Sequence, residues 1–411
     1  MSGSWRKTTL ANVVDIISGG TPKTTVREYW NGDIPWLSVS DFNTGYRWTN
    51  TAEKSITSLG LSKSATTVLN RGDIVISARG TVGVVAQLGK PMAFNQSCYG
   101  IRGKRGIADT NFIYYLLRYT VPSLKQVTHG AVFDTITRDT FEIIEIYLPS
   151  LPEQRAIARL LGTLDDKIEL NRRMNETLEA MARALFKSWF IDFDPVHAKA
   201  EGRNLGLPAD IAALFPDSFE NSDLGDIPKG WRVRKLGELL ELAYGKALKE
   251  SDRRSGPVEV YGSNGQVGWH DEKLEDGPGV IVGRKGNPGV VTWAPNAFFA
   301  IDTSFYVVPR PDCPSLYFLF FVLQNIGLPS LGADSAVPGL NRNVAYLSAQ
   351  LLPPLDVLRR FDRSVGVLFD RMNQTQCESR TLTALRDILL PRLLSGELQT
   401  SPMRQRAEVR S

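Results

Sequence analysis

The chain has few of the residues that form disulfides and metal centres. Its 411 residues include three histidines and three cysteines, which are Cys98, Cys313 and Cys377. The cysteines form no CxxC pair, and no histidine stands at a spacing suited to zinc. We therefore expect no disulfide framework and no metal site, and we interpret each cysteine as an ordinary buried or surface thiol.

Long apolar runs are also missing. No uninterrupted apolar segment approaches the roughly 20 residues that a membrane-spanning helix needs. The opening residues, MSGSWRKTTL, lack the apolar stretch of a secretory signal peptide. The hydrophobic fraction of 42% and the charged fraction of 22% are those of a globular protein, and the length suffices for two or three cores. We expect a cytoplasmic protein with no membrane partner.

Motifs of DNA-modifying enzymes are absent from the sequence as well. There is no [DN]PP[YF] methyltransferase motif and no glycine-rich cofactor loop after a strand. The nearest approach to a phosphate-binding loop, GVVAQLGKP at 83–91, has one residue too many between its glycines. Pro91 also stands where Ser or Thr should bind Mg²⁺. The histidines are scattered and have no candidate nucleophile beside them. We expect the chain by itself not to be an enzyme.

A heptad repeat of apolar residues predicts a long helix in the middle of the chain. The residues on its seam are Ile157, Leu161, Leu164, Ile168, Asn171, Asn175, Leu178, Ala182, Leu185 and Trp189. Nearly five repeats favour a coiled coil over a merely amphipathic helix. Pro152 and Glu153 suit the first turn, and Asp194-Pro195 ends the pattern. Since one helix cannot bury its own apolar stripe, this helix needs a partner.

A second heptad repeat, 204 residues later, predicts that partner in the same chain. Its seam residues are Phe361, Val365, Leu368, Met372, Thr375, Ser379, Leu382, Arg386, Leu389 and Leu393. If the helices run antiparallel, Asn171 and Asn175 meet Ser379 and Thr375 in a polar layer. Polar residues in a seam cost stability and fix the register. The alternative is that the two asparagines are exposed because the helix bends or changes its seam.

The long helices belong to an internal repeat, and such a repeat indicates the architecture of the whole chain. DIVISARGTVGVVAQ matches GVIVGRKGNPGVVTW, and we take Arg79 and Arg284 as equivalent residues of this glycine turn. The matching ranges are 73–87 with 279–293, 131–141 with 336–346, and 5–20 with 231–246. Within the second match, Ile136 and Arg138 align with Leu340 and Arg342.

The repeat predicts an α+β (mixed α/β) protein with two similar globular domains and two long antiparallel helices. These helices form an intramolecular coiled coil with pseudo-twofold symmetry. Helices are expected at 111–126 and 315–328, and strands at 74–77, 82–86, 280–282 and 290–293. The expected domains are a first globular domain at 1–150, the central helix at 151–194, and an extended connector rich in Gly, Pro and Asp at 195–230. They continue with a second globular domain at 231–352, the C-terminal helix at 353–398 and a flexible tail at 399–411.

Two similar domains at a fixed spacing suit a bipartite linear target, and double-stranded DNA is the obvious one. Residues 1–150 contain 16 basic and 11 acidic residues, whereas 231–350 contain 12 of each. The candidate cations for phosphate or guanine are Lys23, Arg79, Arg102, Lys104, Arg105, Lys246, Lys249, Arg253, Arg254, Arg284 and Lys285. Candidate adenine readers are Asn95, Gln96, Asn264 and Gln266. The alternative for any one of them is a solvated surface residue, and the recurrence of an arginine can also reflect a shared turn.

The chain resembles the specificity subunit of a type I restriction–modification system over almost its whole length. The segments that carry the resemblance include SGGTPKT (18–24), IPWLSVSD (34–41), GDIVISARGTVG (72–83), the helix block LPSLPEQRAIARLL at 148–161, VYGSNGQVGW (260–269) and LLPRLLSGEL (389–398). The second helix departs from the first: it starts with LPPLDVL in place of LPSLPEQ, and it carries Arg386 in its seam.

The resemblance implies that each globular domain is a target-recognition domain for one half of a split, asymmetric DNA site. It implies that the helices set the gap and dock two methylation subunits, and that restriction subunits join for cleavage. S-adenosylmethionine, ATP and Mg then belong to the partner subunits, and this chain binds no cofactor. Two alternatives remain open at this stage. They are a stand-alone DNA-modifying enzyme, which the missing motifs disfavour, and a coiled-coil scaffold that does not bind DNA.

Overall fold

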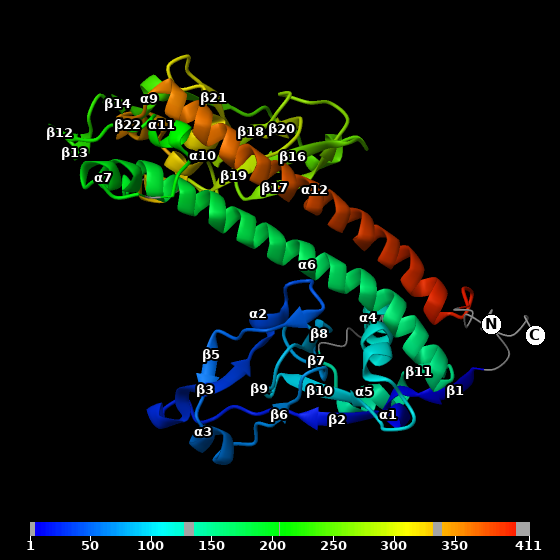
Figure 1. Cartoon of the computed structure of the whole chain (residues 1–411). Coiled ribbons are helices and arrows are strands. Elements are labelled where there is room, and N and C mark those ends of the chain that lie inside the picture. The colour runs from blue at the N-terminus through cyan, green and yellow to red at the C-terminus, as the bar shows by residue number, and fades with distance from the viewer. Residues whose placement is uncertain (1–4, 127–134, 205, 332–338, 400–411) are drawn as a thin grey trace, which may run out of the picture. The chain divides into compact units, whose positions relative to one another are not determined.

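The computed structural model describes residues 5–126, 135–204, 206–331 and 339–399. The chain divides into two compact units (Figure 1). The first unit comprises Met1–Asn171 and Cys377–Ser411, and the second comprises Arg172–Gln376. Each unit therefore contains a globular part together with a stretch of both long helices.

The first unit is built on two sheets and a separate strand pair. One sheet has the order β2-β10-β7-β8-β4, and its strands are Val14–Ser18, Cys98–Gly103, Ile74–Ser77, Val85–Leu88 and Trp48–Thr49. The other has the order β5-β3-β9-β6, with strands Lys54–Ile56, Trp30–Leu37, Met92–Phe94 and Val68–Leu69. Strand β1 (Arg6–Thr9) pairs with β11 (Glu145–Leu148). The helices are α1 (Leu10–Val13), η1 (Arg27–Tyr29), α2 (Val39–Phe42), α3 (Ser58–Ser62), α4 (Thr110–Gln126) and α5 (Arg138–Ile143).

The second unit repeats this plan. Its sheet β15-β21-β18-β19 consists of Leu240–Tyr244, Ser304–Pro309, Gly279–Gly283 and Val291–Ala294. Its sheet β17-β16-β20 consists of Gly265–His270, Val258–Gly262 and Phe298–Ala300. Strand β14 (Arg232–Lys235) pairs with β22 (Ala349–Leu352). The helices are α9 (Leu236–Leu239), η2 (Glu250–Asp252), α10 (Leu316–Asn325), η3 (Leu328–Leu331) and α11 (Arg342–Tyr346).

The element order confirms the internal repeat. The first four strands of the sheet β2-β10-β7-β8-β4 correspond in order and direction to β15-β21-β18-β19. In each unit a strand pair of the second sheet is parallel, β3 with β9 and β16 with β20. The α+β class predicted from the sequence is confirmed as well.

A helix covers the larger sheet in each unit and provides much of its core. In the second unit this helix is α10, whose sequence LYFLFFVLQN is apolar on every side, as expected of a fully buried helix. Ser315 caps it, because its hydroxyl accepts a hydrogen bond from the Phe318 amide at 3.0 Å. Phe318 and Phe321 then pack with Val280 of β18 in one buried cluster. Helix α4 plays the same part in the first unit, where Phe112 packs with the strand residues.

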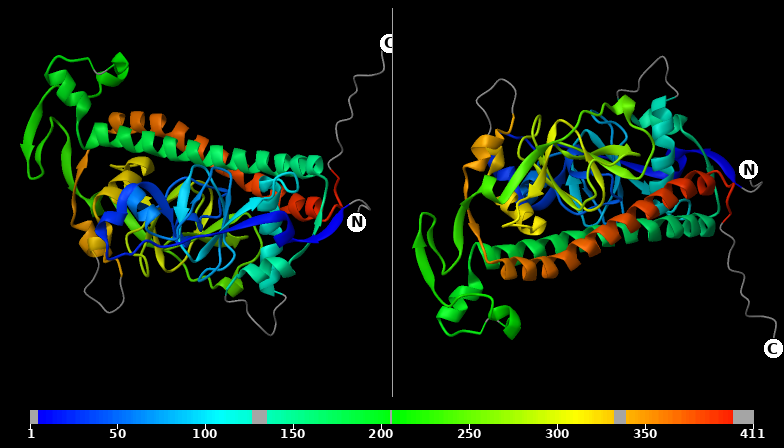
Figure 2. Two further views of the ribbon diagram at one scale, coloured as in Figure 1. Left: turned by 90° about the horizontal axis from the view of Figure 1, so that it is seen from below. Right: turned by 90° about the horizontal axis from the view of Figure 1, so that it is seen from above.

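The two long helices, α6 (Leu151–Phe190) and α12 (Leu355–Leu394), lie side by side in both views of Figure 2. In the first unit the Asn171 amide donates to the Ser379 hydroxyl at 3.2 Å and to the Glu378 carboxylate at 2.8 Å. In the second unit the Thr375 hydroxyl donates to the Asn175 amide oxygen. As the residue number rises along α6 it falls along α12, so the predicted antiparallel pairing is confirmed. The two hydrogen-bonded pairs are those that the heptads place opposite each other.

The arginine in the seam of α12 has a partner that the heptads did not indicate. Arg386 is 7% exposed, and its guanidinium donates to the carboxylate of Asp165 on α6 at 2.7 Å. The other oxygen of Asp165 accepts from the Tyr115 hydroxyl of α4 at 2.6 Å. Burial and the charge of Asp165 raise the pKa of Tyr115, so this hydroxyl keeps its proton. The network joins α4, α6 and α12 inside the first unit.

The segment 195–230 corrects a sequence prediction, because it is folded and not an extended connector. Helix α6 ends at Phe190, and Phe193, whose φ is +52°, precedes α7 (Asp194–Ala200). The segment continues with α8 (Ala209–Ala212) and the hairpin of β12 (Phe219–Ser222) with β13 (Gly225–Pro228). Phe215 is buried in the core of the second unit, and its ring centroid lies 5.1 Å from that of Trp189. The glycines and prolines form turns between short apolar pieces that anchor the segment.

Other boundaries also differ from the sequence predictions. The C-terminal helix, expected at 353–398, spans Leu355–Leu394, and the strand expected at 290–293 spans Val291–Ala294. Strand β8 occupies Val85–Leu88, whereas 82–86 was expected, because Gly83 has a φ of +80° and belongs to the preceding turn. Helix α10 ends at Asn325, before the expected 328, and η3 follows it. Of the tail expected at 399–411, residues 400–411 lie outside the described residues.

The buried ion pair generates a stability prediction. The change Arg386→Met leaves the buried Asp165 carboxylate without its cation, and we expect it to destabilise the first unit by about 3 kcal/mol. The double change Asp165→Asn with Arg386→Met buries no charge, so its loss of stability should be clearly smaller. Chemical denaturation of the purified proteins measures both. Arg392→Met is the control, since Arg392 pairs with Glu397 at the surface. Equal stability of the first variant and the unchanged protein would contradict the prediction.

Candidate nucleic-acid interface

The glycine turn between β7 and β8 builds one edge of the first unit. Gly80 and Gly83 have φ values of +74° and +80°, which side chains rarely adopt, so the turn depends on glycine there. The Ala78 amide donates to the Ser97 carbonyl at 2.7 Å, and the Ile136 amide donates to the Ala78 carbonyl at 2.8 Å. The turn is thereby held between the loop that precedes β10 and the segment that precedes α5. We call this edge, with the residues that follow β2, the turn edge of the first unit.

Four of the sequence-predicted residues lie together on this turn edge. They are Lys23, Arg79, Asn95 and Gln96. Arg79 is exposed in the turn and bridges to Thr135 through its backbone. The Asn95 side chain accepts from the Ser97 amide at 3.1 Å and so shapes its own loop, while Gln96 accepts a hydrogen bond from Thr21.

Three other predicted cations of the first unit lie at the opposite end of the sheet. Strand β10 ends at Gly103, which is paired with Val14, the first residue of β2. Arg102 donates to the Asp73 carboxylate at 2.8 Å, and this hydrogen bond raises the pKa of the guanidinium. The Lys104 ammonium donates to the Ala11 carbonyl at 3.0 Å. Arg102 and Lys104 thus support the fold, while Arg105 is exposed at the same end.

The corresponding edge of the second unit consists of the turns between β18 and β19 and between β16 and β17, together with the residues that follow β15. We call it the turn edge of the second unit, and five of the predicted residues lie on it. Arg284 and Lys285 lie in the turn between β18 and β19, and Lys246 follows β15. Lys249 lies three residues further on, and Asn264 is exposed in the turn between β16 and β17. Arg284 donates to the Asp302 carbonyl at 2.8 Å, so its guanidinium has a defined direction.

Arg253 and Arg254 are engaged in contacts within the second unit. The Arg253 guanidinium donates to the Val267 carbonyl at 2.7 Å. Arg254 forms ion pairs with Asp271 at 2.7 Å and with Glu272. The hydrogen bond to Asp271 is the main reason why the pKa of Arg254 is raised and that of Asp271 is lowered. Two neighbouring carboxylates therefore balance the charge of Arg254.

The backbone contacts correct the assumed equivalence of Arg79 and Arg284. The amide of Arg284 donates to the Thr303 carbonyl at 2.9 Å, and the amide of Leu340 donates to the Arg284 carbonyl at 2.9 Å. These are the contacts that Ala78 makes in the first unit. The residue equivalent to Arg79 is Lys285, since each bridges to the residue before an aligned apolar position, Thr135 or Gly339. Aligning the two arginines shifted the correspondence by one residue.

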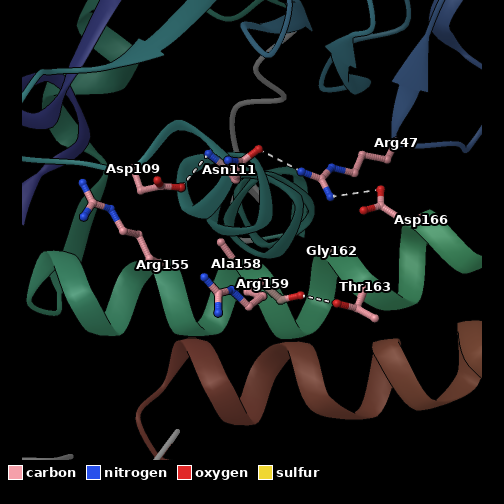
Figure 3. A pocket seen from close by; sticks show the side chains of 9 residues that line it. All are labelled: Arg47, Asp109, Asn111, Arg155, Ala158, Arg159, Gly162, Thr163 and Asp166. Carbon is pink, nitrogen blue, oxygen red and sulfur yellow. Dashed lines mark hydrogen bonds and ion pairs between the residues drawn. The ribbon is translucent and has the colours of Figure 1, made fainter. Parts of the chain in front are cut away.

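A cavity of about 300 Å³ lies elsewhere in the first unit, along α6 (Figure 3). Arg47 enters it from the loop before β4 and is 7% exposed. Its guanidinium donates to Gln87 at 2.6 Å and to Asn111 at 2.8 Å. A Cβ at Gly162 would stand 2.8 Å from the Arg47 guanidinium, so a larger residue there would displace this side chain. The side chain of Asp166 lies 3.8 Å from the same group, so the buried charge is balanced.

The described residues contain no group of three or more His, Cys, Asp and Glu side chains that could hold a metal ion. Among the helices described, none is long and apolar enough to cross a membrane.

Comparison with known proteins indicates which family the chain is similar to. Residues 3–180 match the family model of the type I restriction modification DNA specificity domain. Over 97% of its length the chain is 27% identical to the MjaIX specificity subunit of Methanocaldococcus jannaschii, of which 94% is covered. These matches support a specificity subunit of a type I restriction–modification system.

Two further comparisons agree with this family. The HindI specificity subunit of Haemophilus influenzae is 26% identical, over 72% of this chain and 79% of that protein. The crystal structure of the specificity subunit from M. genitalium superposes with a TM-score of 0.58 at 19% identity, over 95% of this chain and 96% of that one. This second likeness is one of fold.

Each turn edge also contains one arginine that the sequence analysis did not predict as a site residue. Arg138 opens α5, and its guanidinium donates to the Ile16 carbonyl and to the Ser18 hydroxyl, both at 3.1 Å. Arg342 opens α11 and donates to the Leu242 carbonyl at 3.0 Å. The signal was present in the sequence, because the repeat aligns these two arginines. They were left out because they stand outside the glycine turns.

The separation of the cations into two ends of the sheet generates a prediction. Arg79→Gln on the turn edge should weaken binding to duplex DNA several-fold and lower the slope of log K against log salt by about 1. Arg105→Gln removes an equally exposed cation at the opposite end and should leave both quantities unchanged. Fluorescence anisotropy with a labelled duplex at several salt concentrations measures them. The reverse ranking of the two variants would place the interface at the other end.

Proposed function

We propose that the chain is the non-catalytic subunit that gives a type I restriction–modification complex its DNA sequence specificity. The observation that carries the proposal is the duplicated turn edge, which presents cations on the same backbone frame twice in a chain of the specificity-subunit family. A protein that reads two separated stretches of one polymer needs this arrangement, because both stretches share the phosphate backbone and differ in their bases.

We assign the reading of DNA to two target-recognition domains, 1–150 and 231–352, each of which takes one half of an asymmetric bipartite site. The cations at the turn edges supply the sequence-independent attraction to phosphate. Side chains on the same edges then contact the bases in the grooves. The first domain carries the larger excess of basic residues, so it supplies more of the salt-dependent affinity.

The remaining parts of the activity belong to partner subunits. We assign the docking of two methylation subunits to the long helices, with restriction subunits joining the full complex. The adenine-N6 methylation and the cleavage then use S-adenosylmethionine, ATP and Mg held by those partners. In this proposal the chain provides the sequence specificity, and the partner subunits catalyse methylation and cleavage.

Mapping of methylated bases tests the proposed function. Cells that carry the partner subunits are compared with and without this chain, and the methylome of each is sequenced. We expect one bipartite motif to be methylated only when the chain is present. The chain with an unrelated target-recognition domain in place of 231–352 is the matched control, and it should change one half of the motif. Methylation of the same motif in cells lacking the chain would exclude the proposed function.

The proposal also makes the helices a ruler for the gap between half-sites. Seven residues are added to α6 between Arg173 and Met174 and to α12 between Gln376 and Cys377, which keeps the antiparallel register. The pair lengthens by about 10 Å. This length corresponds to about three base pairs and a rotation of roughly 100° around the duplex.

We expect the lengthened chain to methylate the same half-sites with a longer spacer, or to lose activity if the DNA must bend too far. Insertion into one helix alone is the control, since it breaks the register and should abolish methylation. A changed half-site sequence with an unchanged spacer would show that the helices take part in reading bases, against the division of labour proposed.

A further inference from the structure

The two turn edges can be compared residue by residue, because their backbones make the same contacts. Ser18 faces Tyr99 across β2 and β10, and Tyr244 faces Phe305 across β15 and β21. Gly80 and Gly83 have counterparts in Gly286 and Gly289, with φ values of +81° at both. Differences between the two edges therefore lie in side chains on a common frame.

Three positions carry a cation in both units. The first is the Arg79 and Lys285 pair, whose amides donate to Ser97 and Thr303 at 3.2 and 3.1 Å. The second is the Arg138 and Arg342 pair at the starts of α5 and α11. The third consists of Lys23 and Lys249, each of which begins a turn by accepting from the amide three residues later, at 3.2 and 3.0 Å. We call these three pairs the shared cations.

Two positions beside the shared cations differ sharply in chemistry. Where the first unit has the small residues Ser18 and Ala78, the second has Tyr244 and Arg284. Tyr244 is 50% exposed. The guanidinium carbons of Arg342 and Arg284 lie 4.4 and 4.9 Å from the centroid of its ring. The second unit therefore has an aromatic ring in contact with two cations, and Ser18 gives the first unit no ring at this position.

The contacts of this cluster leave donors for a ligand. Arg284 uses one guanidinium nitrogen on the Asp302 carbonyl, and Arg342 uses one on the Leu242 carbonyl. Each guanidinium has five N–H donors in a planar fork, so several remain on each. The acceptors that the structure gives these two groups are backbone carbonyls and no carboxylate, so their charge is not balanced by an ion pair among the described residues. Their contacts with the Tyr244 ring and their hydrogen bonds to the carbonyls restrict both guanidinium groups before any ligand arrives.

We infer that the shared cations bind the DNA backbone in both domains, whereas Tyr244 and Arg284 read bases for the second domain alone. This inference rests on the proposed function. Phosphates are identical at every half-site, so the residues that bind them can recur on a duplicated frame. Bases differ between the half-sites, so the residues that read them must differ. Arg284 has the donor geometry for the O6 and N7 acceptors of guanine, and the exposed ring of Tyr244 supplies an apolar contact beside it.

The test uses the chain assembled with its partner subunits and the methylated motif as the readout. The double change Tyr244→Ser with Arg284→Ala gives the second turn edge the residues of the first. We expect one half of the motif to change or relax at one or more bases, while the other half and the spacer stay as they were. The double change Lys249→Gln with Lys285→Gln should keep the motif. It should lower DNA affinity and reduce the salt slope by about 2. Arg232→Gln, an exposed arginine at the start of β14, is the control and should change neither.

Each outcome decides between the two roles. An unchanged motif for the double change at Tyr244 and Arg284 would overturn the inference, as would a changed motif for the lysine variants. If the double change abolishes methylation, the single change Arg284→Lys distinguishes the two roles. It keeps the positive charge and removes the paired donors of the guanidinium. A relaxed half-site then supports base reading and an unchanged motif contradicts it. The proposed function itself fails separately, if the unchanged complex methylates no bipartite motif.

Discussion

The antiparallel pairing of α6 with α12 is the interaction on which both units depend. The first unit takes its last core residues from the far end of the chain, since Leu393 and Leu394 pack in the same cluster as Phe112 and Ile157. The second unit buries Phe186 and Trp189 of α6 beside Phe361 of α12. Each core combines segments that are far apart in the sequence: Ile157 and Leu393 are 236 residues apart, and Trp189 and Phe361 are 172 residues apart. The pairing therefore turns two sequence repeats into one interdependent protein.

The polar groups of this seam act on register more than on stability. A buried ion pair loses much of its Coulomb energy to desolvation, and an apolar pair of the same volume is often as stable. Asp165, Asn171 and Asn175 penalise other alignments of the two helices. In a shifted register each would face an apolar residue of α12 and would lose its hydrogen bond to that helix. The proposed role of the helices as a ruler needs this selectivity, because a slip of one heptad changes the length by about 10 Å.

The turn edges show how a duplicated fold carries different side chains on a common backbone frame. Glycines with positive φ and a few backbone hydrogen bonds hold the frame, and these groups do not depend on the neighbouring side chains. Residues between them can then vary from serine and alanine to tyrosine and arginine without disturbing the loop. Rigid loops with exchangeable side chains suit the proposed reading of a different base sequence by each domain.

Several features of this protein follow from its sequence alone. The heptads, the internal repeat and the polar seam positions predict the two helices and their antiparallel pairing, because periodicity depends only on residue order. Glycine turns rich in cations likewise indicate where the chain can meet phosphate. The sequence shows Arg386 only as a departure from the apolar seam, since its partner Asp165 lies 221 residues away and on another helix.

Only the tertiary structure decided which cations share a surface. Arg79 and Arg102 are 23 residues apart in one domain, yet β7 and β10 carry them to opposite ends of a sheet. The match of 73–87 with 279–293 already places Arg79 opposite Lys285, and the backbone bridges show that this alignment holds and that the pairing of Arg79 with Arg284 by side-chain type does not. The segment 195–230 is anchored by the contact of Phe215 with Trp189, and the Gly, Pro and Asp content of the segment does not predict this contact. Local patterns specify elements, whereas surfaces arise from strand direction and register, which are set by contacts between distant residues.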